Sequence, residues 1–201
     1  MTTGVNIRRS VANFMLSSLV LLAAWAAGVA FLIGRSEAID LFLFTAPLVV
    51  VFCVFAMAMP SLFRRDSGQP APGFEAANVL TAVRLFLVPP MLVFLVHGHL
   101  MWGAMIYGTI LLTDVFDGYV ARRFGQETLF GLMLDPFADI ASTMAAFSWL
   151  YAGGVVPRWL LFVLITRYSE FFLGIVILAA IGRIPKLHAT MAGKVAGLVQ
   201  G

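Results

Sequence analysis

Charged residues are scarce in this sequence. Lys, Arg, Asp and Glu make up 11% of the 201 residues, whereas hydrophobic residues make up 61%. A soluble domain usually carries roughly a quarter charged residues, so this chain has too few of them to cover an aqueous surface. The scarcity excludes an ordinary soluble domain and predicts a protein whose surface faces lipid.

Cysteine is nearly absent too. Cys53 is the single cysteine, and it lies inside an apolar run, which excludes an internal disulfide. We also expect no cleavable signal peptide, because the first apolar run is too long and no small-residue cleavage site follows it. We see no internal repeat and no low-complexity tract.

Long apolar runs are what the sequence has instead. A membrane-spanning helix needs about 20 mostly apolar residues. Six stretches meet this requirement, at residues 11–33, 41–62, 79–97, 101–119, 131–153 and 158–181. The sequence therefore predicts an all-α integral membrane protein with six transmembrane helices.

The basic residues are distributed unevenly between the loops. If the N-terminus is cytoplasmic, alternation of six spans leaves only Arg35 and Arg158 on the outer side. The cytoplasmic side then receives Arg8, Arg9, Arg64, Arg65, Arg122, Arg123, Arg183, Lys186 and Lys194. This bias follows the positive-inside rule and predicts a cytoplasmic N-terminus. Because these residues are spread over separate membrane-flanking loops, we do not expect nucleic acid as a partner.

Two parts can be distinguished along the chain. Residues 1–65 contain two helices that resemble plain lipid-facing spans, and residues 66–77 form a linker rich in turn-forming residues. Residues 78–201 carry polar and charged side chains at helix ends and inside apolar segments, which marks functional sites in membrane proteins. His97 and His99, in the short outer turn after the third span, are expected to be solvated loop side chains.

Four aspartates lie near the cytoplasmic ends of the fourth and fifth spans. Residues three, four and seven apart share a helix face, so Asp114 and Asp117 line one stripe of the fourth span. Asp135 and Asp139 share a face at the start of the fifth. The short connection makes these spans antiparallel neighbours, so both carboxylate pairs can converge at the cytoplasmic interface.

Four neighbouring carboxylates repel one another unless cations neutralise them. Mg²⁺ and Mn²⁺ prefer oxygen ligands and also hold phosphates. Two such ions on a diphosphate can stabilise the attacking and the leaving oxygen of a displacement. Gly118 and Ala121 leave room on the same helix face, and Arg122 offers a fork suited to phosphate. A purely structural interpretation, in which helix-end charges meet lipid headgroups, explains one or two aspartates but not this whole set.

The spacing D-x2-D-G-x2-A-R-x8-G-x3-D-x3-D, from Asp114 to Asp139, resembles the signature of the CDP-alcohol phosphotransferase family. The resemblance implies a two-metal site, with Mg²⁺ or Mn²⁺, that binds the diphosphate of a CDP-linked lipid. It implies metal ligation by Asp114, Asp117 and Asp135. Asp139 then takes the role of general base, and also that of a further metal ligand. The residues implied to contact CDP or phosphate are Gly118, Ala121, Arg122, Gly131, Asn78 and Thr81.

Flanking residues extend this resemblance over about residues 75–200. Asn78, Thr81 and Arg84 resemble the family's N-x-x-T-x-x-R start of its first core helix, although Asn78 and Thr81 are also ordinary helix-capping residues. Gly193-Lys194 resembles the family's later G-K pair, after which members of the family usually carry two further core helices. Because this chain stops at Gly201, we expect the core to be truncated at its C-terminus.

The run from Phe130 to Asp139 resembles the F-G-x-x-L-D-P-x-A-D-K pattern of phosphatidylglycerophosphate synthases, with Ile140 in place of the lysine. This likeness implies glycerol 3-phosphate as acceptor, with inositol phosphate or a neutral amino alcohol left open. The basic residues available to a dianionic acceptor are Arg84, Arg123, Lys186 and Lys194.

The sequence thus predicts a membrane enzyme that transfers a phosphatidyl group from a CDP-diacylglycerol-type donor to a small alcohol, releasing CMP on the cytoplasmic side of the cell or inner membrane. A Mg²⁺-dependent intramembrane prenyltransferase is the enzymatic alternative, but it would not need Gly118, Ala121 and Arg122. A cation transporter would place its carboxylates near the bilayer midplane. A non-catalytic scaffold and a homodimer both stay open.

Overall fold

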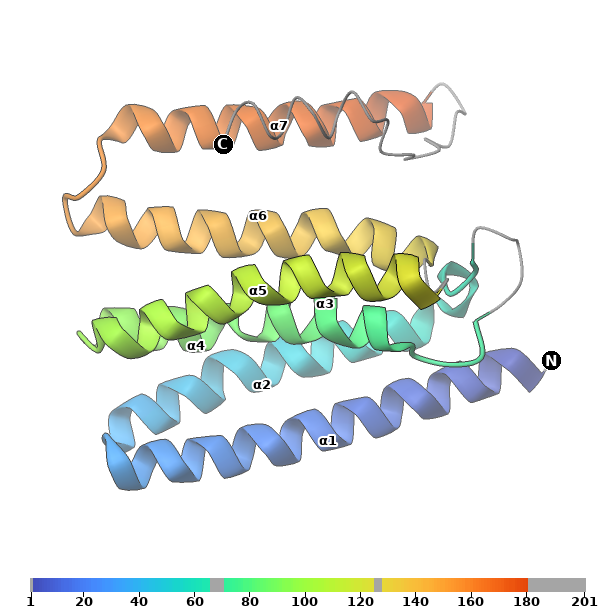
Figure 1. Ribbon diagram of the computed structural model, residues 1–201, viewed down its shortest axis with the longest axis horizontal. Helices are drawn as coiled ribbons and strands as arrows, with labels where there is room; N and C mark the ends of the chain where they lie inside the picture. Colours follow the sequence, from blue (N-terminus) through green and yellow to red (C-terminus); the bar gives the residue numbers. More distant parts are fainter. Residues whose placement is uncertain (1, 66–70, 125–127, 181–201) are drawn as a thin grey trace. The chain divides into compact units, whose positions relative to one another are not determined.

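The computed structural model of the chain describes residues 2–65, 71–124 and 128–180, and these residues are almost entirely helical. The elements are α1 (Thr2–Leu32), α2 (Arg35–Ala58), the short 3₁₀ helix η1 (Pro60–Leu62), α3 (Ala76–Phe86), α4 (Val88–Val96), α5 (Leu100–Phe124), α6 (Leu129–Ala152) and α7 (Arg158–Ala180) (Figure 1). Arg65 and Thr128 form an isolated antiparallel bridge. The predicted all-α class is confirmed.

Among the residues that the structure describes, four helical segments are long and apolar enough to cross a membrane. They are Gly4–Leu32, Arg35–Ala58, Ala76–Val96 and Leu129–Ala152, and the apolar part of α5, Leu100–Asp114, is shorter. The chain is therefore an integral membrane protein, as its composition predicts.

The third predicted span is not one continuous helix. The segment 79–97 corresponds to α3 and α4, which are separated at Leu87. Pro89 and Pro90 explain the break, because neither residue has the amide hydrogen that would continue the helical ladder. The backbone recovers at once, since the Met91 amide donates to the Leu87 carbonyl at 3.1 Å.

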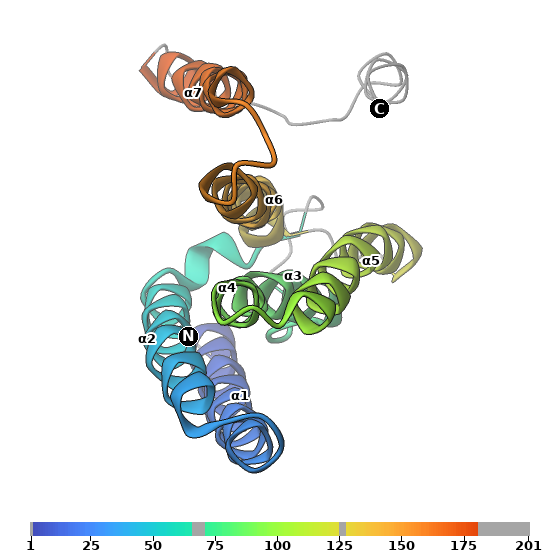
Figure 2. The same cartoon turned by 90° about the vertical axis from the view of Figure 1, so that its left-hand side faces the viewer.

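Residues 1–156 form one compact unit, and residues 157–201, of which α7 is the described helix, form a second. In the first unit, α1 and α2 form an antiparallel hairpin, α3 packs against α5 and α6, and α4 contacts α2, α5 and α6. Figure 2 looks nearly along the helices and shows α3 and α4 in the middle of this group. The starts of α3 and α6 and the far end of α5 lie at the same end of the unit as the N-terminus (Figure 1).

Two apolar clusters hold the first unit together. The cluster nearer the N-terminus is rich in phenylalanine, and Phe52, Phe63, Phe74 and Phe130 form several close ring contacts within it. The cluster at the other end includes Leu41, Met91 and Ile110 among its buried residues. Both clusters combine residues from the N-terminal hairpin and from later helices, so the first two helices are packed on their neighbours.

The turn between α4 and α5 differs from its predicted solvated state. His97 Nε2 lies 2.9 Å from Asp40 Oδ2, and His99 Nε2 lies 3.5 Å from Glu37 Oε1. His97 is only one-quarter exposed. The sequence pattern missed these contacts because the start of α2 lies some 60 residues earlier in the chain.

Candidate active site

The candidate site is built on one face of α3. Asn78, Thr81 and Arg84 are three residues apart and are all buried. An arginine within an apolar helix is costly unless it is paired or reaches water. Arg84 is paired, because its guanidinium lies among three carboxylates from two other helices.

The carboxylates around Arg84 come from α5 and α6. Arg84 Nη1 forms an ion pair with Asp114 Oδ1 of α5. The same nitrogen lies 3.1 Å from Asp139 Oδ1, and Nη2 lies 3.5 Å from Asp135 Oδ1, both on α6. Three of the four aspartates predicted to converge are therefore brought together, and they meet around a side chain of α3.

The three carboxylates are about half-exposed, whereas the Arg84 side chain that pairs with them is buried. The side chains of Asp114, Asp135 and Asp139 are 51%, 47% and 52% exposed, against 1% for Arg84. Thr81 Oγ1 also donates a hydrogen bond to Asp135 Oδ1 at 2.8 Å, which fixes one oxygen of that carboxylate. The site thus consists of three half-exposed carboxylates that surround one buried guanidinium.

A buried polar junction joins the starts of α3 and α6. Thr128 is the N-cap of α6: its hydroxyl accepts a hydrogen bond from the Gly131 amide at 3.1 Å, the usual role of an N-cap threonine. The same hydroxyl donates to Asn78 Oδ1 at 3.0 Å. A Cβ atom at Gly131 would stand 2.8 Å from Asn78 Oδ1, so the glycine allows the two helices to approach. Asn78 and Gly131 therefore contribute to helix packing here, and their predicted contacts with CDP stay predictions.

The remaining predicted residues are described in part. Arg123 is exposed on the last turn of α5. The side chains of Asp117, Gly118, Ala121 and Arg122 lie outside the described residues, as do Lys186 and Lys194. Among the side chains that are described, no group of three or more His, Cys, Asp or Glu residues is arranged to hold a metal ion.

Thr128 and Arg65 are the neighbours of the site that the sequence analysis did not single out. A signal existed for Thr128, because a threonine directly before an apolar run is a common helix start. For Arg65 there was none beyond its place in a basic pair that flanks the membrane.

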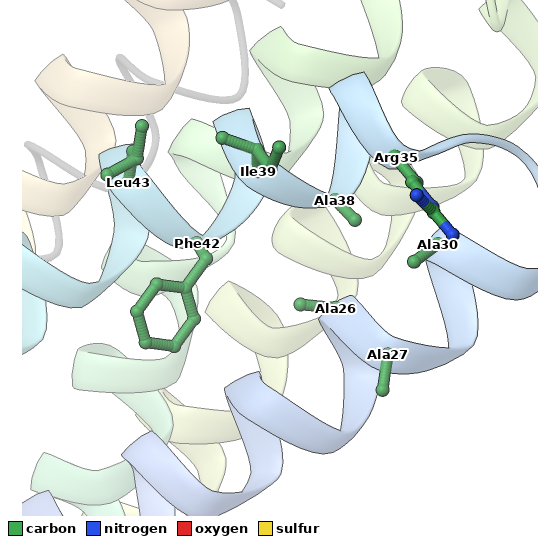
Figure 3. A pocket seen from close by; sticks show the side chains of 8 residues that line it. All are labelled: Ala26, Ala27, Ala30, Arg35, Ala38, Ile39, Phe42 and Leu43. Carbon is green, nitrogen blue, oxygen red and sulfur yellow. The ribbon is translucent and has the colours of Figure 1, made fainter.

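A shallow groove lies elsewhere, at the connection between α1 and α2. Its lining is mostly apolar and includes Ala26, Ala30 and Phe42, with Arg35 at its edge (Figure 3). None of its lining residues belongs to the carboxylate cluster.

Comparison with known proteins gives a consistent result. The family model for CDP-alcohol phosphatidyltransferase matches residues 74–201. The chain is 35% identical over 151 residues to a probable phosphatidylglycerophosphate synthase of Mycobacterium tuberculosis, covering 67% of this chain and 69% of the relative. No solved structure gives a significant match.

Shorter matches involve proteins named CDP-diacylglycerol–glycerol-3-phosphate 3-phosphatidyltransferase. The one from Cereibacter sphaeroides is 36% identical over 88 residues, 42% of this chain and 40% of that protein. The one from Rickettsia bellii is 43% identical over 65 residues, 31% of this chain and 36% of that protein.

Proposed function

The chain belongs to the CDP-alcohol phosphatidyltransferase family, and from this premise we propose that it transfers the phosphatidyl group to glycerol 3-phosphate at the carboxylate cluster around Arg84. It is a membrane enzyme of phospholipid biosynthesis that uses a CDP-linked lipid and an alcohol and releases CMP. The observation that carries the choice of site is the convergence of Asp114, Asp135 and Asp139 on one buried guanidinium.

The carboxylate of Asp139 is the proposed general base. It is half-exposed, so an acceptor hydroxyl can approach it. The proton of that hydroxyl passes to Asp139 as the oxygen attacks the β-phosphorus of the donor. The bond between this phosphorus and the bridging oxygen of CMP breaks, and CMP leaves with the electron pair.

The chemistry of the cluster suits a divalent cation. Carboxylate oxygens are the ligands that Mg²⁺ and Mn²⁺ prefer. Because the aspartate side chains are half-exposed, they can turn toward an ion without disrupting buried packing. We propose that Asp114, Asp117, Asp135 and Asp139 hold two such ions, which would neutralise the diphosphate. Arg84 then serves as the fixed counter-charge that keeps three of these aspartates together, because its guanidinium already contacts them.

Glycerol 3-phosphate is proposed as acceptor because several relatives carry it in their names. Its phosphate needs a basic partner near the cluster. Arg123 is exposed at the end of α5 and, with Lys186 and Lys194, is a better candidate than Arg84. The predicted acceptor role of Arg84 would require its guanidinium to leave the aspartates.

The acceptor is tested by competition. With CDP-diacylglycerol and Mg²⁺ or Mn²⁺, equal concentrations of glycerol 3-phosphate, inositol phosphate, serine and choline are offered to the purified protein, and the lipid products are separated. We expect phosphatidylglycerophosphate to dominate, and Arg123→Ala to raise KM for glycerol 3-phosphate more than KM for the donor. A clear preference for serine or choline would refute the acceptor assignment, and no CMP release with any acceptor would refute the proposed reaction.

We further propose six spans with the N-terminus and the carboxylate cluster on the cytoplasmic side. The distribution of basic residues supports this orientation. It is also supported by the common position of the N-terminus and the site-bearing ends of α3, α5 and α6 at one end of the first unit (Figure 1).

Cysteine labelling tests the topology. In a Cys53→Ala background, Asn6→Cys should react with a membrane-impermeant maleimide only after the cytoplasmic side is opened. Val155→Cys, in the turn after α6, should react in intact cells. Both positions are exposed in the structure, whereas Cys53 is buried. The opposite pattern would reverse the orientation, and labelling of both positions from one side would contradict the number of spans between them.

A further inference from the structure

Arg65 lies at the point where α3 and α6, two of the site-bearing helices, begin. Its guanidinium forms an ion pair with Glu75, the residue directly before α3. Its backbone forms an antiparallel bridge with Thr128, the N-cap of α6. Next to this bridge, the Leu129 amide donates to the Arg64 carbonyl at 3.0 Å. One residue thus contacts the start of α3 with its side chain and the start of α6 with its backbone.

The ion pair fixes the start of α3 because Glu75 is buried. The Glu75 side chain is 7% exposed and that of Arg65 is 32% exposed. Loss of the cation from a buried carboxylate is strongly destabilising. The start of α3 therefore stays next to Arg65. The hydrogen bond from Arg65 to Glu75 raises the pKa of Arg65.

Apolar contacts support the same junction. Phe63, two residues before Arg65, stacks on Phe130 in the first turn of α6, with ring centroids 4.4 Å apart. Phe74, next to Glu75, lies 5.9 Å from the Phe63 ring and 6.3 Å from the Phe130 ring. The Phe74 amide also donates to Ser10 Oγ of α1 at 3.1 Å. The N-terminal helices are therefore joined to the starts of both α3 and α6.

Small shifts at this junction are carried to the carboxylates. A helix rises about 1.5 Å per residue, so Asp135 lies roughly 10 Å beyond Thr128, and Thr81 roughly 9 Å beyond Glu75. Thr81 and Asp135 are themselves hydrogen-bonded. Because α3 and α6 are each continuous over these residues, a tilt or slide at their starts changes how Asp135 and Asp139 meet Thr81 and Arg84.

We propose that Arg65 is a positioning residue for the transfer reaction, which sets α6 against α3 through Glu75 and Thr128. It lies before residues 74–201, the part that matches the family model, so the N-terminal segment supplies part of the scaffold of the site. The inference rests on the proposed function, because it presumes that the Arg84 carboxylate cluster is where CMP is released.

The test measures kcat and KM for CMP release, together with the thermal midpoint, in the full-length protein. Displaced catalytic groups can cost up to about 10²-fold in rate. For Arg65→Ala we expect about a tenfold lower kcat, with KM for CDP-diacylglycerol within about threefold of wild type. Arg65→Lys keeps the charge opposite Glu75 and should retain most of the activity. Arg65→Ala combined with Glu75→Gln should be no worse than the more impaired single variant, because both changes break the same pair.

Two matched controls separate positioning from other effects. Arg64→Ala removes a neighbouring, exposed arginine whose backbone carbonyl accepts the hydrogen bond at the junction, and its kcat should be unchanged. Asp40→Asn weakens the contact with His97 at the opposite end of α2, so it should lower the thermal midpoint without lowering kcat.

The outcomes are distinguishable. An inactive wild-type protein would contradict the proposed function itself. An active wild type with unchanged kcat in Arg65→Ala would overturn the positioning role, whether or not the thermal midpoint fell. A raised donor KM at normal kcat would make Arg65 a binding residue. An equal loss in Arg64→Ala would assign the effect to surface charge. Either of these last two results also overturns the inference.

Discussion

Replacement of Asp114 or Asp117 with asparagine is expected to abolish both CMP release and divalent-cation binding. Each change removes one negative charge from a shared cluster while keeping the size of the side chain. Asp114 already forms an ion pair with Arg84, and Asp135 and Asp139 remain beside the guanidinium in the variant. We therefore expect the Asp114→Asn protein to fold, with a loss that is chemical. The measurements are CMP release and Mn²⁺ binding followed by electron paramagnetic resonance.

Asp40→Asn is the matched control for this prediction. It removes a carboxylate of the same kind from α2, where its partner is His97, and it should keep both wild-type Mn²⁺ affinity and CMP release. If Asp114→Asn or Asp117→Asn bound Mn²⁺ as tightly as wild type, that residue would not be a metal ligand.

Much of the fold could be predicted because the signals were local. Each apolar run of about 20 residues corresponds to a helix or, for 79–97, to a pair of helices divided at Leu87. Pro89 and Pro90 were visible in the sequence, but a proline pair either bends or divides a helix. Whether the helix bends or divides depends on the helices that pack against it in the fold. Helical spacing in the sequence does not identify those neighbouring helices.

The part of the site that depends on helical spacing within one helix could be predicted from the sequence. Asp135 and Asp139 share a face because they are four residues apart, and this face meets Arg84. The role of Arg84 was less accessible. It lies 30 residues before Asp114, and a single arginine near a helix end can equally extend to the lipid headgroups. Only the packing of α3 against α5 and α6 selects the carboxylates as its partners.

The contacts of the N-terminal helices were even harder to predict from the sequence. Their apolar composition indicates lipid-facing spans, and many of their large side chains are exposed. Yet Ser10 and Phe52 also contact Phe74, and Asp40 contacts His97. Such contacts depend on single side chains at positions far apart in the chain, so no periodic pattern reports them.

Asp139→Asn is expected to separate catalysis from donor binding. The Asp139 carboxylate is half-exposed and only partly engaged, with Oδ1 at 3.1 Å from Arg84 Nη1. An asparagine can keep the shape of this contact but cannot accept the proton of the acceptor. We expect turnover to fall by about 10²-fold or more, the usual scale for loss of a general base, while affinity for CDP-diacylglycerol stays within about threefold of wild type. Rapid-quench measurement of CMP formation and equilibrium binding of the donor give the two quantities.

Chemical rescue provides the sharper version of this test. Asp139→Ala leaves space beside Arg84 at a position that is open to its surroundings, so formate can enter and take the acceptor proton. Turnover of this variant should rise with formate concentration, and it should rise more than turnover of Asp114→Ala, because Asp139 is the proposed proton acceptor and Asp114 is not. If Asp139→Asn lost donor binding and turnover equally, and formate restored neither, Asp139 would act primarily as a metal ligand, and the proton of the acceptor would have to pass to a different group.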